Sequence, residues 1–193
     1  MSEKKKNRSV LRSQKMLKDG FLDLMQQKPI QQITVKELCD HVDLNRGTFY
    51  LHYRDMYDLL DHIESEILEQ FNEIIHAYSP EESNGKPSLL LKSIFRFLGD
   101  NSDFCRMVLG VNRDRNFINK LKTVLKEKCF SDWEYLYSNR ASELYEPFYA
   151  FMLSGCIGII ENWLNSSNAS QTADEIAELT EKIILHGIQV FKE

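Results

Sequence analysis

Apolar residues recur every three or four positions along most of the chain, and no segment keeps the strict alternation of a strand. The segment 35–42 shows this spacing, with Val35, Leu38, Cys39 and Val42 on one stripe. Glycine and proline, which interrupt helices, number only 8 and 4 among 193 residues. The pattern therefore predicts an all-α protein. Helices are expected at residues 10–27, 34–42, 46–53, 55–77, 89–99, 103–109, 114–137, 144–165 and 172–193.

Two short helices near the N-terminus are joined by residues 43–45. The first begins with a capping box, in which Thr34 and Glu37 each satisfy a free backbone N–H group. Asn45 suits the N-cap of the second helix, because its side-chain oxygen accepts a hydrogen bond from the first turn. This arrangement predicts a helix-turn-helix. Many helical proteins contain such a corner, so the side chains of the second helix decide its function.

The helical phase gives the second helix two opposite faces. Phe49 and Tyr53 point toward the core of the motif. A helix in the DNA major groove needs small groups where it approaches the base edges. The opposite face carries residues of this kind, Gly47, Thr48 and Leu51.

Polar side chains flank that face. Tyr50 and His52 lie on its two sides, where they would reach the two phosphate walls of the groove. Arg46, in the first turn, would read a base, since arginine is the usual bidentate partner of guanine. The second helix is therefore expected to bind DNA.

The charge distribution agrees with a polyanion at one end of the protein. Residues 1–56 carry 11 Lys and Arg against 7 Asp and Glu, and the remainder carries 13 against 22. Chance clustering is the alternative explanation for so small an excess. The basic tail with Lys4, Lys5, Lys6 and Arg8 is either a solvated terminus or an arm that reaches DNA.

The segments 33–38 (ITVKEL) and 44–53 (LNRGTFYLHY), followed by Leu59, resemble the DNA-binding signature of the tetracycline-repressor (TetR) family. The run 155–164 (GCIGIIENWL) also looks like the C-terminal region of one Gram-positive branch of that family. The resemblance implies phosphate contacts from Thr34, Thr48, Tyr50 and His52, and base contacts from Lys36, Arg46, Gly47 and Leu51. Asn45 and Tyr53 complete the expected DNA-binding set.

The chain departs from the family pattern at three positions. Asp43 replaces the usual glycine of the turn, and aspartate tolerates the left-handed conformation at modest cost. Tyr53 stands where Phe is common. Met56 replaces a lysine that would bind phosphate, so that contact is either missing or supplied by Arg54.

The segments 144–165 and 172–193 have more apolar surface than one body can obviously cover. Gly155 and Gly158 would let two backbones approach closely. We therefore expect a two-fold homodimer through a four-helix interface, with a monomer core as the alternative. The expected interface residues are Phe148, Met152, Gly155, Ile159, Trp163, Ile176, Ile183 and Gly187.

The resemblance implies a small-molecule pocket in the body, although for any one aromatic residue plain core packing is the simpler explanation. The candidate pocket residues are Ile63, Ile67, Phe71, Phe95, Phe104, Phe117 and Phe151. We place the helix-turn-helix head at residues 1–54 and the ligand-binding and dimerisation body at 55–193.

The motifs of other classes of protein are missing. The sequence has no phosphate-binding glycine loop, nucleophile elbow or paired-histidine motif, so we expect no enzyme, cofactor or metal site. The four cysteines lack zinc or redox spacing and are expected to be small buried hydrophobes. No stretch predicts a signal peptide or a membrane span, and we expect a cytoplasmic protein.

These observations predict a sequence-specific transcription regulator that binds an inverted-repeat operator in double-stranded DNA. The resemblance favours a repressor that a small-molecule effector releases from its operator. The alternative is an activator or co-regulator with the same fold, controlled by a protein partner.

Overall fold

The computed structural model describes residues 2–79, 88–109, 115–137, 142–166 and 171–188. These residues form helices and connecting turns and contain no strand, which confirms the all-α prediction. The helices are α1 (Ser2–Gln27), η1 (Ile30–Gln32), α2 (Val35–His41), α3 (Arg46–Tyr50), α4 (Met56–His76), α5 (Ser88–Asp100), α6 (Ser102–Leu109), α7 (Arg115–Tyr137), α8 (Ser142–Asn165) and α9 (Ala173–Ile188).

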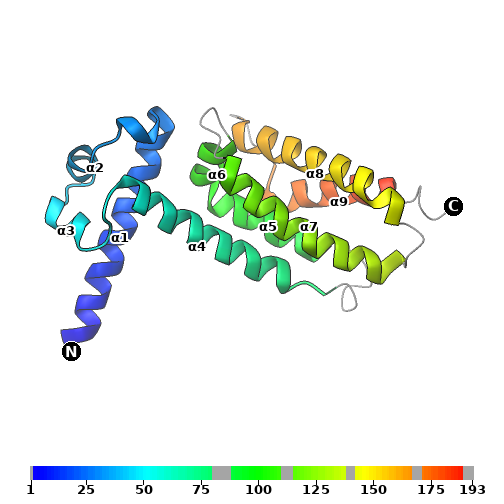
Figure 1. Ribbon diagram of the computed structural model, residues 1–193, viewed down its shortest axis with the longest axis horizontal. Coiled ribbons are helices and arrows are strands. Elements are labelled where there is room, and N and C mark those ends of the chain that lie inside the picture. The colour runs from blue at the N-terminus through cyan, green and yellow to red at the C-terminus, as the bar shows by residue number, and fades with distance from the viewer. Residues whose placement is uncertain (1, 80–87, 110–114, 138–141, 167–170, 189–193) are drawn as a thin grey trace.

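A small head of α1, α2 and α3 stands at one end of a longer helical body (Figure 1). Its core contains Leu38 and Phe49, as the sequence predicts, together with Leu17 and Phe21 of α1, and all four are fully buried. The first helix begins at Ser2, well before the expected start, and its N-terminal end projects away from the head (Figure 1).

Gly20 lets the first two helices pack closely. A Cβ atom added to Gly20 would lie 2.2 Å from Cγ1 of Val42, closer than two carbon atoms can approach. Both residues belong to the contact between α1 and the end of α2, so the glycine is required by packing rather than by backbone conformation.

The turn between α2 and α3 follows the predicted chemistry. Asp43 has a φ of 53°, so aspartate adopts the left-handed conformation where the family usually has glycine. Asn45 caps α3 by accepting a hydrogen bond from the Gly47 N–H at 2.8 Å. Thr34 caps α2 through the Glu37 N–H at 3.2 Å, while the Glu37 carboxylate pairs with Lys28. Only half of the predicted capping box therefore forms there.

The body consists of α4 to α9, with α4 along one long edge and α8 along the other (Figure 1). Asp55 caps α4 by accepting a hydrogen bond from the Asp58 N–H at 2.9 Å, which agrees with the expected helix start at residue 55. A complete capping box begins α9: Thr172 accepts a hydrogen bond from the Glu175 N–H, and the Glu175 carboxylate accepts one from the Thr172 N–H. Among the described residues, no helix is both long and apolar enough to cross a membrane.

Candidate nucleic-acid interface

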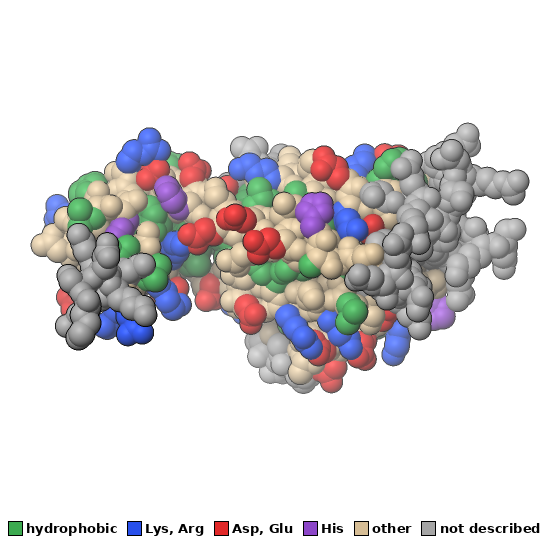
Figure 2. All heavy atoms as spheres, turned by 90° about the horizontal axis from the view of Figure 1, so that it is seen from below, with side chains coloured by type: hydrophobic (Ala, Val, Ile, Leu, Met, Phe, Trp, Pro, Cys, Tyr) green, Lys and Arg blue, Asp and Glu red, His purple; other side chains and the backbone are tan. Residues whose placement is uncertain are grey.

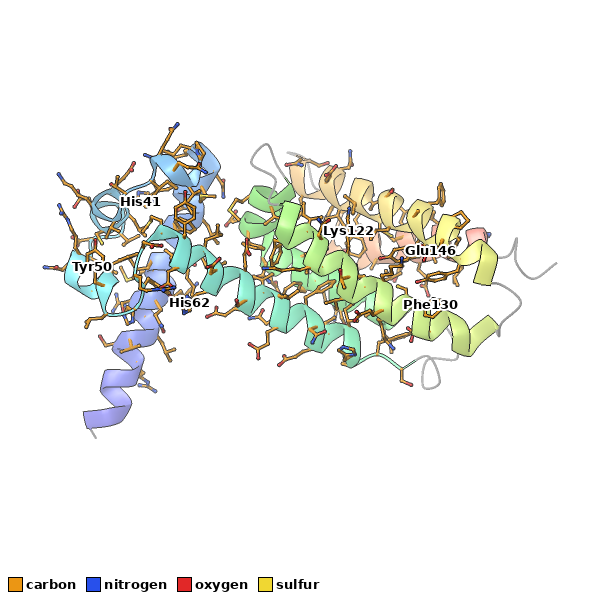
Figure 3. The ribbon with its side chains drawn as sticks, in the orientation of Figure 1. His41, Tyr50, His62, Lys122, Phe130 and Glu146 are labelled. Atoms are coloured by element: carbon orange, nitrogen blue, oxygen red, sulfur yellow. The ribbon has the colours of Figure 1, made fainter. Side chains whose placement is uncertain are left out.

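One face of α3 is buried and the opposite face is open, as the helical phase predicts. Phe49 is fully buried, whereas Tyr50 is 59% exposed and Leu51 81% exposed. Arg46 and Gly47 are also exposed. Figure 3 shows Tyr50 at the end of the head farthest from the body. An exposed leucine beside a glycine leaves an apolar surface through which the helix can approach base edges.

The structure ends α3 at Tyr50, earlier than the predicted end at Tyr53. Leu51 is the C-cap, and its N–H donates to the carbonyl of Gly47 at 3.2 Å. The Tyr53 N–H still donates to the carbonyl of Phe49 at 2.9 Å. The segment after α3 therefore keeps a helical turn without continuing the helix.

Tyr53 lies in the core, and its side chain is only 3% exposed. Its ring packs between Phe49 and His62, with ring centroids 5.7 and 5.3 Å away. Burial, followed by the charges of Glu66 and Asp58, raises the pKa of Tyr53 to about 12. The expectation that Tyr53 contacts DNA is therefore wrong, and its helical phase was the better guide.

His52 is half-buried and bound to the first helix. Its Nε2 lies 2.9 Å from Oγ of Ser13, and the Ser13 hydroxyl donates to the carbonyl of Val10 at 2.9 Å. Because the serine proton is directed to Val10, the Nε2–H group is the donor to Ser13. This hydrogen bond fixes the ring beside α3 and was not predicted from the sequence.

The structure also shows the surroundings of Met56 and Arg54, the two residues considered for the phosphate contact that a lysine makes in the family signature. Met56 is buried, and Arg54 is exposed but pairs with Asp58. Its Nη2 donates to Oδ1 of Asp58 at 2.7 Å, and its backbone N–H donates to Oδ2 at 2.9 Å. The side-chain hydrogen bond from Arg54 is the largest cause that lowers the pKa of Asp58. A phosphate would have to compete with this carboxylate for Arg54.

Several cations on the head are open to solvent. Within the part of the chain that the structure describes, Arg8, Arg12, Lys36 and Arg46 are exposed and form no ion pair with a described residue. Thr34 is exposed beside Lys36. Figure 2 shows Lys and Arg side chains at several places around the head. The side chains of residues 4–6 lie outside the described residues.

Comparisons with known proteins agree with this head. Residues 19–63 match the model of bacterial regulatory proteins of the tetR family, and residues 85–186 match a transcriptional regulator C-terminal region of the TetR type. The second match alone covers more than half of the chain. The chain belongs to the TetR family.

Individual relatives support the same assignment. The dhaKLM operon transcriptional activator DhaS of Lactococcus lactis subsp. lactis (strain IL1403) is 29% identical over 106 residues, which are 54% of this chain and 52% of the relative. The chain spans about half or less of the length of the curated relatives it matches.

Solved structures share the fold over nearly the whole chain. The fatty acid degradation regulator FadR from Bacillus halodurans has a TM-score of 0.65 and 16% identity, with 91% of this chain and 95% of that chain covered. A DhaS structure has a TM-score of 0.61 and 20% identity, with 92% and 96% covered.

The body of this TetR-family protein contains an apolar cavity of about 110 Å³ between α4, α5, α6, α7 and α8. Four of the candidate pocket residues line it, Ile67, Phe71, Phe104 and Phe117. Helices α5 and α8 line the cavity through residues such as Phe97 and Ile157 rather than the predicted Phe95 and Phe151, because periodicity does not show which turn of a helix meets the cavity.

Three candidate pocket residues do not line the cavity. Ile63 is buried in the core farther along α4 toward the head. Phe95 is buried in a second cluster with Leu91 and Ile176. Phe151 is 72% exposed on α8. A stripe on a helix identifies an apolar face, but the packing partner decides whether that face meets a core, a cavity or another subunit.

The exposed apolar face of the body lies on α8 and α9. Phe151 is 72% exposed and Ile183 is 49% exposed. At Gly155 and Gly158 an added Cβ would meet no atom within 4 Å, so the backbone of α8 is open there. Between the two helices is a shallow hollow of about 60 Å³, lined by Phe148, Phe151, Met152, Gly155, Cys156, Ile159, Thr180, Ile183 and Ile184.

Two of the expected interface residues pack against α5 of the same subunit. Ile176 is 4% exposed and packs on Leu91 and Phe95 of α5. The Trp163 ring lies 5.8 Å from that of Phe95, and its Nε1–H donates to the carbonyl of Gln171. The placement of Ile176 in a dimer interface is therefore wrong, because α5 already covers it. Trp163 is half-buried, so its placement in the interface stays a prediction. The surroundings of Gly187 lie outside the described residues.

The described residues also bear on whether the protein has a metal site or a reactive cysteine. Among them, no three His, Cys, Asp or Glu side chains are grouped as a metal ion requires. Cys39 and Cys105 are buried as expected, whereas Cys129 and Cys156 are half-buried. Burial raises the pKa of the Cys105 thiol to about 12, so this thiol stays neutral.

Proposed function

We propose that this TetR-family protein binds an inverted-repeat operator in double-stranded DNA through α3 and regulates transcription there. The observation that carries the proposal is that α3 buries Phe49 on one face and exposes Leu51 on the other, with Arg46 also exposed and in no ion pair with a described residue. The proposal assigns no catalytic step, and a protein bound to bacterial DNA would act in the cytoplasm.

The residues of the head have distinct roles in this proposal. Arg46 reads a base, while Gly47 and Leu51 allow the helix to approach the groove floor. The exposed hydroxyl of Tyr50 donates to a phosphate. Thr34, Lys36, Thr48 and His52 are the further candidates for phosphate or base contacts, and Asn45 acts mainly by capping α3.

Whether His52 can donate a hydrogen bond to a phosphate depends on the protonation of its ring. Its Nε2–H group is engaged by Ser13, so a neutral ring has only the acceptor Nδ1 left. A cationic ring donates from both nitrogens. Only the cation can therefore bind a phosphate while it keeps the contact to Ser13.

The operator is bound by a two-fold dimer. The exposed face of α8 and α9, with Phe151, Gly155, Gly158 and Ile183, supports an isologous four-helix interface. A symmetric dimer presents two α3 helices, so the half-sites would be related by inversion and separated by about one helical turn or more.

A small molecule in the body cavity would control the head. The cavity wall includes Ile67 and Phe71 of α4, the helix that continues into the head, and Phe104 and Val108 of α6. Helix α4 follows α3 directly in the chain, and α6 packs on α1 of the head. An occupant that shifts either helix would change the spacing of the two α3 helices.

The sign of regulation has two candidates. Repression that an effector relieves is the first. Activation together with a protein partner is the second. The similarity to DhaS, a transcriptional activator, supports activation as a candidate. A titration of operator DNA with the purified protein alone separates them, because a co-regulator would bind tightly only when its partner is added.

The test of the DNA-binding proposal is footprinting and affinity measurement on the DNA next to its own gene. Wild type should protect an inverted repeat, and Arg46→Ala should lose affinity for it by about 1–3 kcal/mol while binding random DNA as before. Lys126→Ala is the matched control, since this cation lies on α7 and pairs with Glu146. Protection of no DNA by wild type would contradict the proposal.

A further inference from the structure

The wall of the body cavity is uniformly apolar. Its side chains are aromatic or aliphatic, apart from Cys105 and Lys122, and no polar atom is exposed to the cavity. Lys122 lines it without presenting its ammonium group, and Figure 3 shows this residue on the side of α7 that faces α8. The carbonyl of Lys122 is also satisfied, because it accepts a hydrogen bond from the Tyr149 hydroxyl at 3.1 Å.

Such a wall discriminates against charged ligands. A carboxylate or ammonium group placed in the cavity would lose its hydration and find no donor, acceptor or counter-ion. Even a hydroxyl or amide would be left without a partner, which costs about 1–3 kcal/mol. The occupant that loses least on entry is therefore a molecule with no polar group.

The size of the cavity sets the second condition. Its volume is about 110 Å³, somewhat below the roughly 150 Å³ of an engineered apolar cavity that stays dry and binds benzene. Small adjustments of Phe104 and Phe117, whose rings meet edge to face at 5.1 Å, would admit one ring and little more. A long acyl chain would require a much larger space.

We propose that this cavity binds a small, uncharged, apolar molecule of about the size of one aromatic ring, and that such a molecule is the effector. The regulatory half of this inference rests on the proposed function, whereas the binding half does not. Because Phe104, Cys105 and Val108 line the cavity from α6, the occupant would press on the helix that packs against α1 of the head.

Toluene and benzoate form a matched pair of probes, since they share a ring and differ by a methyl group against a carboxylate. The melting temperature of the full chain is measured with each probe in sealed cells. Toluene should raise it by about 2–4 °C, because a ligand that binds only the folded state stabilises that state. Benzoate should leave it unchanged. An equal or larger shift with benzoate, or no shift with toluene, would overturn the proposal.

Variants locate the binding site. Leu121→Phe fills the cavity from α7 and should abolish the toluene shift, as should Ile157→Phe from α8 if the first variant folds poorly. Leu68→Phe is the control, because Leu68 is a partly buried residue of α4 outside the cavity wall. A toluene shift that persists in both filled variants would place binding elsewhere and refute the assignment.

Operator binding is measured on the same samples. If the protein binds its operator but not toluene, the proposed DNA function stands and this inference is refuted. If it binds toluene but no DNA, the assignment of the cavity stands and the proposed function is refuted. A protein that binds both, with operator affinity unchanged by saturating toluene, refutes the effector half of the inference alone.

Discussion

Gln26, in the last turn of α1, donates a hydrogen bond from Nε2 to Oδ1 of Asp103 on α6 at 3.3 Å. The same carboxylate oxygen accepts from Nη1 of Arg106 at 2.9 Å. Nε of Arg106 in turn donates to the carbonyl of Leu164 near the end of α8 at 3.0 Å. The head is therefore joined by polar contacts, through α6, to a helix of the proposed dimer interface.

Removal of this acceptor should loosen the head without unfolding the protein. Asp103→Ala leaves Gln26 and Arg106 without their shared partner, but exposed pairs contribute only about 0–1 kcal/mol to stability. Amide hydrogen exchange at residues 22–27 should become severalfold faster, because α1 loses a contact with the body. Glu146→Ala, which breaks an exposed pair between α7 and α8, should leave exchange there unchanged. Identical exchange in both variants would show that the contact does not hold the head.

The packing of Gly20 on Val42 predicts a specific rescue. Gly20→Ala places a Cβ 2.2 Å from Cγ1 of Val42, and overpacking of this kind costs about 1–3 kcal/mol in unfolding free energy. Val42→Ala in the same chain removes the clashing methyl group and should restore much of that loss. Urea unfolding of the two single variants and the double variant measures the coupling. Additive losses would mean that the clash is relieved in some other way.

The same substitution, tyrosine to phenylalanine, at Tyr50 and at Tyr53 distinguishes a residue that contacts DNA from a residue of the core. Tyr50→Phe removes an exposed hydroxyl and should weaken binding to all DNA sequences alike. Tyr53→Phe removes a hydroxyl from a residue that is 3% exposed and should leave DNA binding within about twofold. Affinity titrations on operator and random DNA give both values. Weaker DNA binding by Tyr53→Phe than by Tyr50→Phe would reverse the assignment.

The burial of Tyr53 should also affect how the stability of the protein depends on pH in alkaline solution. Burial raises its pKa to about 12 from an ordinary value of 10.0, so the unfolded state loses its proton first. The contribution to stability is present below pH 10 and is lost as the pH rises toward about 12. Tyr53→Phe should reduce the pH dependence of unfolding free energy in this window. An unchanged slope would show that Tyr53 ionises equally in both states.

The α8–α9 face predicts the effect of a charge on assembly. Gly155→Glu places a carboxylate where the backbone is open in one subunit and would be covered in a dimer. Sedimentation should show a monomer at micromolar concentration, and operator affinity should fall sharply because one head makes half of the contacts. Asn72→Glu, an exposed position on α4, is the control and should remain a dimer. A monomeric wild type would contradict the dimer directly.

Local sequence signals predicted the all-α fold and the caps of the head helices. The caps at Thr34, Asn45 and Asp55, and the left-handed Asp43, depend on residues within one turn, which a sequence displays directly. The buried and exposed faces of α3 follow from its period for the same reason. The end of α3 was placed too late, because its last turn differs from a helix only in backbone geometry.

Contacts between distant segments were not predictable in the same way. The sequence shows that Ile176 and Phe151 lie on apolar faces, but α5 covers Ile176 and no described residue covers most of Phe151. The cavity, the bond from His52 to Ser13 and the bond from Gln26 to Asp103 join residues on different helices. No periodic pattern within one helix indicates which other helix it meets.

The central claim, that α3 reads DNA sequence through Arg46, is tested most directly by the discrimination of Arg46→Ala between its operator and a scrambled duplex at one salt concentration. Arg46→Ala should lose about 5–150-fold in operator affinity and change little in affinity for the scrambled duplex. An unchanged ratio of the two affinities would contradict the account.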